Sequence, residues 1–150
     1  MNRICKCFGS TKKKQLTIND LEGVDNKIPL FSLDGQIHQA KVVNIYDGDS
    51  IKVVIILNNT LTRFTIRMSG YDSPELRTKN EEEKKAGIKA RDILKNKILN
   101  KIVVLHCGKF DKYGRLLGYI FVNNTNINEW MISNNYGYRY DGGTKVQFKS

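Results

Sequence analysis

Two acidic residues near the middle of the chain are spaced so that they could bind one metal ion together. Asp47 and Asp49 flank a glycine, and residues two apart on an extended chain project to the same side. Hard cations such as calcium prefer carboxylate and carbonyl oxygens, which this segment supplies. Asp-Gly is also a common turn pair, so the segment alone is equally consistent with a plain turn.

A second acidic segment follows further along the chain, where Asp72 and Glu75 flank Ser73-Pro74. The proline fixes its own φ and disfavours helical geometry for Ser73, which holds the two acids in a stiff bend. Taken alone, this bend is also consistent with a capped loop that leads into a helix. Two such acidic bends in one basic protein favour a site for a hard cation.

Two arginines are suited to bind a phosphate group near that cation. Arg67 lies five residues before Asp72, and Arg115 follows Asp111-Lys112-Tyr113-Gly114. A guanidinium group can donate to two phosphate oxygens at once. Each arginine alone is also consistent with a solvated strand residue or with an edge-strand charge that opposes aggregation.

The candidate residues lie at or near the ends of predicted strands. Runs rich in isoleucine and valine, separated by turn signals, predict five strands. These strands span residues 36–46, 50–57, 61–71, 101–107 and 115–122. Asn80 and Glu83 resemble a capping box, and the apolar stripe after them predicts a helix over residues 80–99. A shorter helix is predicted to start near Asn126.

This order of elements predicts the fold class. Three strands, a helix, two strands and a helix are the order of a five-stranded Greek-key barrel of the OB type, an α+β fold made mainly of strands that often binds nucleic acid. The barrel domain is predicted over residues 36–150, and residues 16–35 are expected to form an extension that packs on it. Residues 1–15 carry five basic residues and no acid, which predicts a flexible basic arm.

The net charge favours a polyanionic partner. The 150 residues include 25 Lys and Arg against 15 Asp and Glu, which gives a formal net charge of +10. Such an excess favours a phosphate backbone or an anionic membrane surface. The hydrophobic fraction of 40% is ordinary for a globular domain, and we expect a monomer.

The cysteines indicate an intracellular protein. Their number, three, is odd, and Cys5 and Cys7 lie in the basic arm, so a disulfide framework is not expected. His106 and Cys107 are adjacent and would point to opposite faces of a strand, which disfavours a shared zinc ion.

No apolar run reaches membrane-spanning length, and the N-terminus lacks the apolar stretch of a secretory signal.

The basic arm has a second interpretation. Cys5 and Cys7 among lysine and arginine residues resemble a palmitoylated, polybasic membrane anchor. Position 2 is Asn, which excludes N-myristoylation. The two alternatives are peripheral membrane attachment through the acylated arm and a plain basic tail.

Three motifs in this order resemble the staphylococcal nuclease (thermonuclease-like) family. They are Tyr46-Asp47-Gly48-Asp49-Ser50, then Arg67 five residues ahead of Asp72-Ser73-Pro74-Glu75, then Asp111-Lys112-Tyr113-Gly114-Arg115. The resemblance covers roughly residues 38–140. It implies a calcium-dependent endonuclease that hydrolyses the phosphodiester bonds of DNA or RNA.

The resemblance also implies which residues bind the metal. Asp49, Asp72 and the backbone carbonyl of Ser73 match the family's calcium ligands, with serine where the family usually has threonine. Only a carbonyl is needed at that position, so the exchange is expected to cost little. Asp47 matches an acid that acts on the metal largely through water.

Further matches imply the residues that act on the substrate. Arg67 and Arg115 match the pair that binds the scissile phosphate, and Glu75 matches the proposed general base. Lys112 and Tyr113 match neighbours of the adjoining phosphate.

Tyrosines near the C-terminus offer aromatic faces on which bases can stack. Tyr136, Tyr138 and Tyr140 alternate along the sequence, and we predict that Tyr138 and Tyr140 bind the substrate.

The main alternative function is a non-catalytic OB module that binds nucleic acid or a protein partner. Both arginines, the base and the metal-ligating acids are all present, which such a module does not require. The sequence therefore favours the nuclease.

Overall fold

The computed structural model describes residues 15–143 and Phe148, and its contacts divide the chain into two units after Phe31. The first unit contains a short 3-10 helix, η1 (Ile18–Leu21), which begins where the backbone N–H of Thr17 donates to Asp20 Oδ2 at 2.7 Å. The packing of the predicted extension, residues 16–35, on the barrel stays a prediction. Cys5 and Cys7 lie outside the described residues, so their acylation also stays a prediction.

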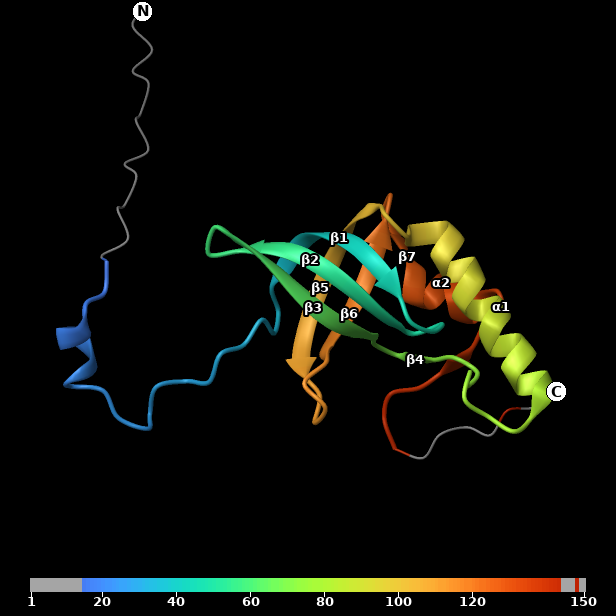
Figure 1. Ribbon diagram of the computed structural model, residues 1–150, viewed down its shortest axis with the longest axis horizontal. Coiled ribbons are helices and arrows are strands. Elements are labelled where there is room, and N and C mark those ends of the chain that lie inside the picture. The colour runs from blue at the N-terminus through green and yellow to red at the C-terminus, as the bar shows by residue number, and fades with distance from the viewer. Residues whose placement is uncertain (1–14, 144–147, 149–150) are drawn as a thin grey trace, which may run out of the picture. The chain divides into compact units, whose positions relative to one another are not determined.

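The second unit is built on a closed five-stranded barrel (Figure 1). The order of neighbouring strands is β3-β2-β1-β5-β6, and a parallel pairing of β3 with β6 closes the sheet. The strands are β1 (Ile37–Ile45), β2 (Ser50–Leu57), β3 (Thr60–Met68), β5 (Ile102–Phe110) and β6 (Leu116–Val122). This confirms the predicted OB-type barrel.

Asparagine pairs form the tight turns that set the strand register. Asn58 and Asn59 join β2 to β3 with φ values of 48° and 63°. Asparagine tolerates this left-handed region better than most residues, and two positive φ values in a row are typical of a type I′ hairpin turn. The resulting register places Ser50 opposite Arg67. A second pair, Asn123-Asn124, joins β6 to the two-residue strand β7 (Thr125–Asn126) in the same way.

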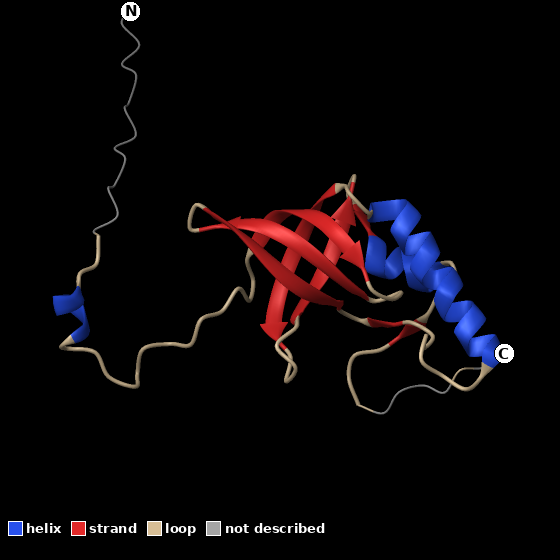
Figure 2. Cartoon of the chain, viewed as in Figure 1, coloured by secondary structure: helices blue, strands red, loops and turns tan. Residues whose placement is uncertain are grey.

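The two predicted helices are present, and both lie on the same side of the barrel (Figure 2). The longer helix, α1 (Glu81–Ile98), begins after Asn80, whose side chain accepts hydrogen bonds from the backbone N–H groups of Glu82 and Glu83 at 3.0 and 3.2 Å. Its buried face includes Ala90, Leu94 and Ile98. The shorter helix is α2 (Ile127–Ser133). No helix in the described part of the chain is long and apolar enough to cross a membrane.

The third strand ends earlier than its sequence predicts. A single strand was expected over residues 61–71, but β3 ends at Met68 and Gly70 turns the chain with a φ of +70°. The next residues form a separate strand, β4 (Tyr71–Asp72), which pairs with β8 (Tyr138–Arg139). The glycine therefore redirects the chain away from the barrel, and the acidic bend lies beside the C-terminal segment.

A buried asparagine connects α2 to the barrel. Asn128 is 0% exposed. Its Oδ1 accepts from the backbone N–H of Ile120 at 3.1 Å, and its Nδ2 donates to the carbonyls of Ser69 and Gly118 at 2.8 and 3.1 Å. One side chain thus satisfies backbone groups of β6 and of the turn after β3.

Replacing Asn128 with alanine should lower the free energy of unfolding by about 2–4 kcal/mol, because buried backbone groups lose their partner. Chemical denaturation of the variant and the wild type measures the difference. Asn134→Ala is the matched control, since the exposed Asn134 side chain donates to Trp130 O at the helix end and its loss should cost less than about 0.5 kcal/mol. Equal stability of Asn128→Ala and the wild type would contradict this role.

Candidate active site

A cleft of about 360 Å³ brings together most of the residues that the sequence singled out. They come from the β1–β2 turn, the end of β3, the bend after β4, the β5–β6 turn and the C-terminal segment. The lining residues are Asp47, Asp49, Ser50, Arg67, Asp72, Ser73, Glu75, Lys112, Tyr113, Arg115 and Tyr140. Of the predicted site residues, Tyr138 does not line this cleft; it lines a neighbouring groove.

The first acidic segment is a turn whose carboxylates also hold other parts of the site. Asp47 Oδ1 accepts from the backbone N–H groups of Asp49 and Ser50 at 3.1 and 2.6 Å. Asp49 Oδ2 accepts from both the backbone N–H and the hydroxyl of Ser73, at 2.8 and 3.1 Å. The turn and site interpretations are therefore compatible, and Asp49 links the two acidic segments.

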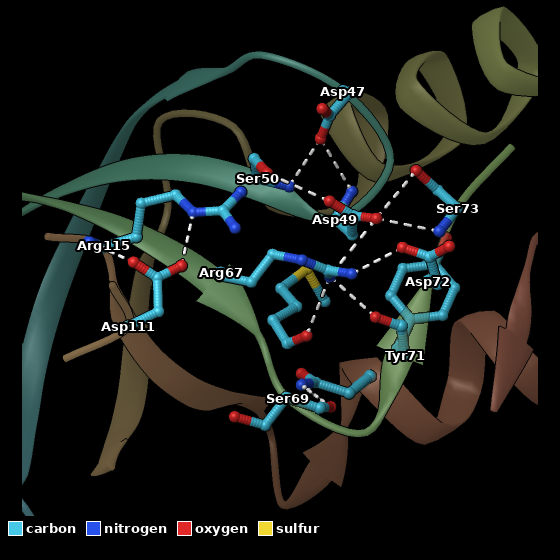
Figure 3. Close-up of polar contacts among 12 residues, drawn as sticks. Asp47, Asp49, Ser50, Arg67, Ser69, Tyr71, Asp72, Ser73, Asp111 and Arg115 are labelled. Carbon is cyan, nitrogen blue, oxygen red and sulfur yellow. Dashed lines mark hydrogen bonds and ion pairs between the residues drawn. The ribbon is translucent and has the colours of Figure 1, made fainter. Parts of the chain in front are cut away.

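Arg67 lies between the two acids that were predicted to bind the metal (Figure 3). Its Nη1 is 3.2 Å from Asp49 Oδ2, and its Nη2 is 2.6 Å from Asp72 Oδ1. The three side chains are only 11%, 9% and 8% exposed. Nη1 also donates to the carbonyls of Met68 and Tyr71 at 3.1 and 2.7 Å. The guanidinium group therefore neutralises much of the buried negative charge in the cleft.

Negative charge nevertheless accumulates on the Asp47 side. Burial, together with the charge of Asp49, raises the pKa of Asp47 to about 6. A bound cation would favour the ionised form of this carboxyl, because an opposite charge stabilises it.

Arg115 is held in place by an acid on its own turn. Asp111 Oδ2 accepts from Arg115 Nε at 2.7 Å, and Asp111 Oδ1 accepts from the backbone N–H groups of Tyr113 and Arg115, each at 2.9 Å. Partial burial acts in the opposite direction, but these hydrogen bonds and the charge of Arg115 hold the pKa of Asp111 below its usual value. Asp111 was not predicted as an orienting residue, although its position four residues before Arg115 within one turn was the signal.

Glu75 is exposed and lines the cleft beside the first turn of α1. Its backbone N–H donates to Glu83 Oε1 at 3.4 Å. The bend that carries Glu75 is thus attached to α1, and its carboxylate is accessible to water and substrate.

Three glycines allow other segments to pack closely on the second acidic bend. A Cβ at Gly48 would lie 2.6 Å from Ser73 Cβ, and one at Gly87 would lie 2.7 Å from Pro74 O. A Cβ at Gly137 would lie 2.4 Å from Asp72 O. We call these three residues the glycine collar. Their close approach fixes the bend from the β1–β2 turn, from α1 and from the segment before β8.

A comparison with known families identifies the domain. Residues 65–148, more than half of the chain, match the family model described as staphylococcal nuclease homologue. The chain belongs to the staphylococcal nuclease family.

Individual relatives support membership of the staphylococcal nuclease family. An uncharacterized protein of Methanocaldococcus jannaschii is 33% identical over 125 residues, which is 67% of this chain and 58% of the relative. An uncharacterized protein of Bacillus anthracis is 37% identical over 102 residues, 66% of this chain and 46% of the relative. An uncharacterized endonuclease of Escherichia coli O157:H7 is 28% identical over 93 residues, 61% of this chain and 54% of the relative. The chain spans about half the length of the curated relatives it matches.

The nuclease-family cleft offers oxygen ligands of the kind that calcium prefers. Among the described residues, no three His, Cys, Asp or Glu side chains converge as a metal-binding group. The predicted ligand set has only two direct carboxylates, Asp49 and Asp72, and takes its third ligand from the Ser73 carbonyl. This set consists entirely of oxygen atoms in a buried, acidic part of the cleft, which fits a hard cation.

Proposed function

We propose that the chain is a calcium-dependent endonuclease that hydrolyses phosphodiester bonds of DNA or RNA. The observation that carries this proposal is the convergence, in one cleft, of two arginines, the Asp49–Asp72 pair and Glu75. A phosphodiester is anionic, so its hydrolysis needs positive charge held where the transition state gathers negative charge. The cleft supplies that charge together with a carboxylate that can accept a proton.

The two arginines would bind the scissile phosphate. The contacts of Arg67 within the described residues engage Nη1 and Nη2, which leaves its Nε–H available to a phosphate oxygen. The Nε of Arg115 is bound to Asp111, so its Nη groups are the ones available to the phosphate. Both groups are oriented before substrate arrives, and such preorganised donors stabilise the transition state most effectively.

Glu75 would act as the general base. Its exposed carboxylate lines the same cleft as the arginines. A water molecule between Glu75 and the phosphate would pass a proton to the carboxylate as its oxygen attacks phosphorus, and the leaving oxygen departs on the opposite side. A positioned base of this kind contributes about 10²–10⁴ in rate.

Calcium would be held by Asp49, Asp72 and the Ser73 carbonyl, with Asp47 acting through water. When bound, calcium supplies positive charge at the phosphate and orients the attacking water. Arg67 already contacts both carboxylates, so it keeps them in place for the ion.

Three further side chains line the outer part of the cleft and would bind the rest of the substrate. Tyr113 is 72% exposed, and its ring lies 5.1 Å from Lys112 Nζ. Tyr140 lines the cleft from the C-terminal segment. An ammonium group and aromatic rings are suited to an adjoining phosphate and its base.

The test is incubation of the purified chain with supercoiled plasmid, single-stranded DNA and RNA, first with calcium and then with a chelator. We expect cleavage that stops in chelator and returns when calcium is restored, since both the charge and the water orientation need the ion. Binding without cleavage in calcium would select the non-catalytic module. Undiminished cleavage in chelator would reject the calcium requirement.

A further inference from the structure

A second groove, of about 420 Å³, lies between α1 and the segment that follows α2. Its walls include Ala86 and Lys89 of α1 on one side and Tyr136 and Tyr138 on the other, with Phe148 and Pro74 also lining it. The groove has no role in the chemistry described above.

This groove begins where the catalytic cleft ends. Pro74 lines the groove, while its two neighbours in sequence, Ser73 and Glu75, line the cleft. Likewise Tyr138 lines the groove and Tyr140, two residues later, lines the cleft. A polymer that leaves the cleft past these two segments would therefore enter the groove.

The walls carry the groups that bind single-stranded nucleic acid. Tyr136, Tyr138 and Phe148 supply aromatic rings, and Lys89 Nζ lies 5.9 Å from the centre of the Tyr136 ring. Proteins bind single strands by stacking bases on aromatic rings and by pairing phosphates with cations along a groove. Lys85, one helical turn before Lys89, is exposed and adds positive charge to that face of α1.

Contacts within the protein hold the Tyr136 side of the aromatic wall before any ligand binds. The Tyr136 ring lies 5.7 Å from the Trp130 ring of α2. Its backbone carbonyl accepts from the buried Tyr71 hydroxyl at 3.1 Å. The glycine collar residue Gly137 packs on β4 between the two tyrosines. A prearranged wall loses little conformational freedom when a base stacks on it.

We propose that this groove binds a nucleotide of the substrate strand beyond the two that the scissile phosphate joins, with its base on the tyrosines and its phosphate at Lys89. The inference rests on the proposed nuclease function and extends it to a second subsite. Tyr138, which the sequence predicted to bind the substrate, then does so in the groove rather than in the cleft. The single strand is favoured because only a flexible, unstacked chain can continue from the cleft into a narrow aromatic groove.

The test measures, in the presence of calcium, the affinity for two probes: a dinucleotide and a fluorescent oligothymidylate of about eight nucleotides. The parent protein and every variant carry Glu75→Gln so that the probes are not cleaved. Lys89→Ala and Tyr138→Leu should each weaken binding of the long probe, Tyr138→Leu by about 5- to 100-fold, and change the dinucleotide affinity less than about twofold. Lys89→Ala should also reduce the salt slope of the long probe's affinity by about 0.7, the effect of one lost phosphate contact on a single strand.

Lys95→Ala is the matched control, because Lys95 is an exposed lysine of the same helix that does not line the groove; it should leave both affinities unchanged. The proposal is overturned if Lys89→Ala binds the long probe as the parent does, or if both probes weaken equally. If the parent binds neither probe, the nuclease proposal itself fails, which is a separate result. Lys89 is an exposed surface residue. We therefore expect Lys89→Ala to fold normally, so that a change in its probe binding reports on the groove.

Discussion

Replacing Glu75 with glutamine is expected to lower kcat for DNA cleavage by about 10²–10⁴-fold. Glutamine keeps the shape and polarity of the side chain but cannot accept the proton of the attacking water. The Kd for substrate should change little, because the arginines that bind the phosphate are untouched. Single-turnover cleavage in calcium measures the rate, and anisotropy of a labelled oligonucleotide measures binding.

Glu82→Gln is the control for this experiment. It removes the same charge from an exposed side chain in the first turn of α1, and Glu82 does not line the cleft. It should cleave at the wild-type rate. If Glu75→Gln also cleaved at that rate, Glu75 would not be the base.

Replacing Arg67 with methionine is expected to affect both rate and stability. The unbranched methionine keeps the packing of the side-chain stem but removes the guanidinium, and losing one preorganised donor costs about 10²–10³ in kcat. It also leaves Asp49 and Asp72 buried without their shared partner, and breaking a buried ion pair in this way costs about 3–5 kcal/mol of folding free energy. Thermal unfolding in chelator should therefore show a lower Tm.

Added calcium and a second arginine variant distinguish the loss of cleavage rate from the loss of folding stability. Calcium should restore part of the Tm of Arg67→Met, because an ion that binds only the folded state stabilises it. Arg115→Met should lose a comparable rate but keep the wild-type Tm, since the Arg115 side chain is 32% exposed and its partner lies on the same turn. A wild-type Tm for Arg67→Met in chelator would contradict the role of Arg67 as counter-ion to the two acids.

The features that sequence predicted well depend on local physics. Asn80 caps α1 because its side chain reaches the next turn, and the turn around Asp47 forms because a short carboxylate can accept from the backbone two and three residues later. The alternation along each strand likewise predicts its buried face. These patterns were sufficient for the five-stranded barrel and for the position of each acidic bend.

The double ion pair of Arg67 was not predicted, because it depends on contacts between distant segments. The β2–β3 register places Arg67 beside Asp49, and the turn at Gly70 brings Asp72 back to the same guanidinium. Neither contact is a property of a local pattern. The resemblance implied only that Arg67 binds phosphate.

Tyr138 shows a related failure of strand periodicity. Tyr136, Tyr138 and Tyr140 alternate, which suggests one common face, but β8 is only two residues long. Alternation does not persist beyond so short a strand. Tyr138 and Tyr140 therefore line different hollows on either side of the acidic bend.

The glycine collar has a consequence for how this domain tolerates mutation. Gly48, Gly87 and Gly137 lie far apart in the sequence, and none of them has a side chain that could perform chemistry. A methyl group added at any one of them would be too close to an atom of the bend: Ser73 Cβ for Gly48, Pro74 O for Gly87 and Asp72 O for Gly137. Three positions without any chemical role thus restrict the sequence around the site, and searches for sequence variants that improve the domain should keep all three as glycine.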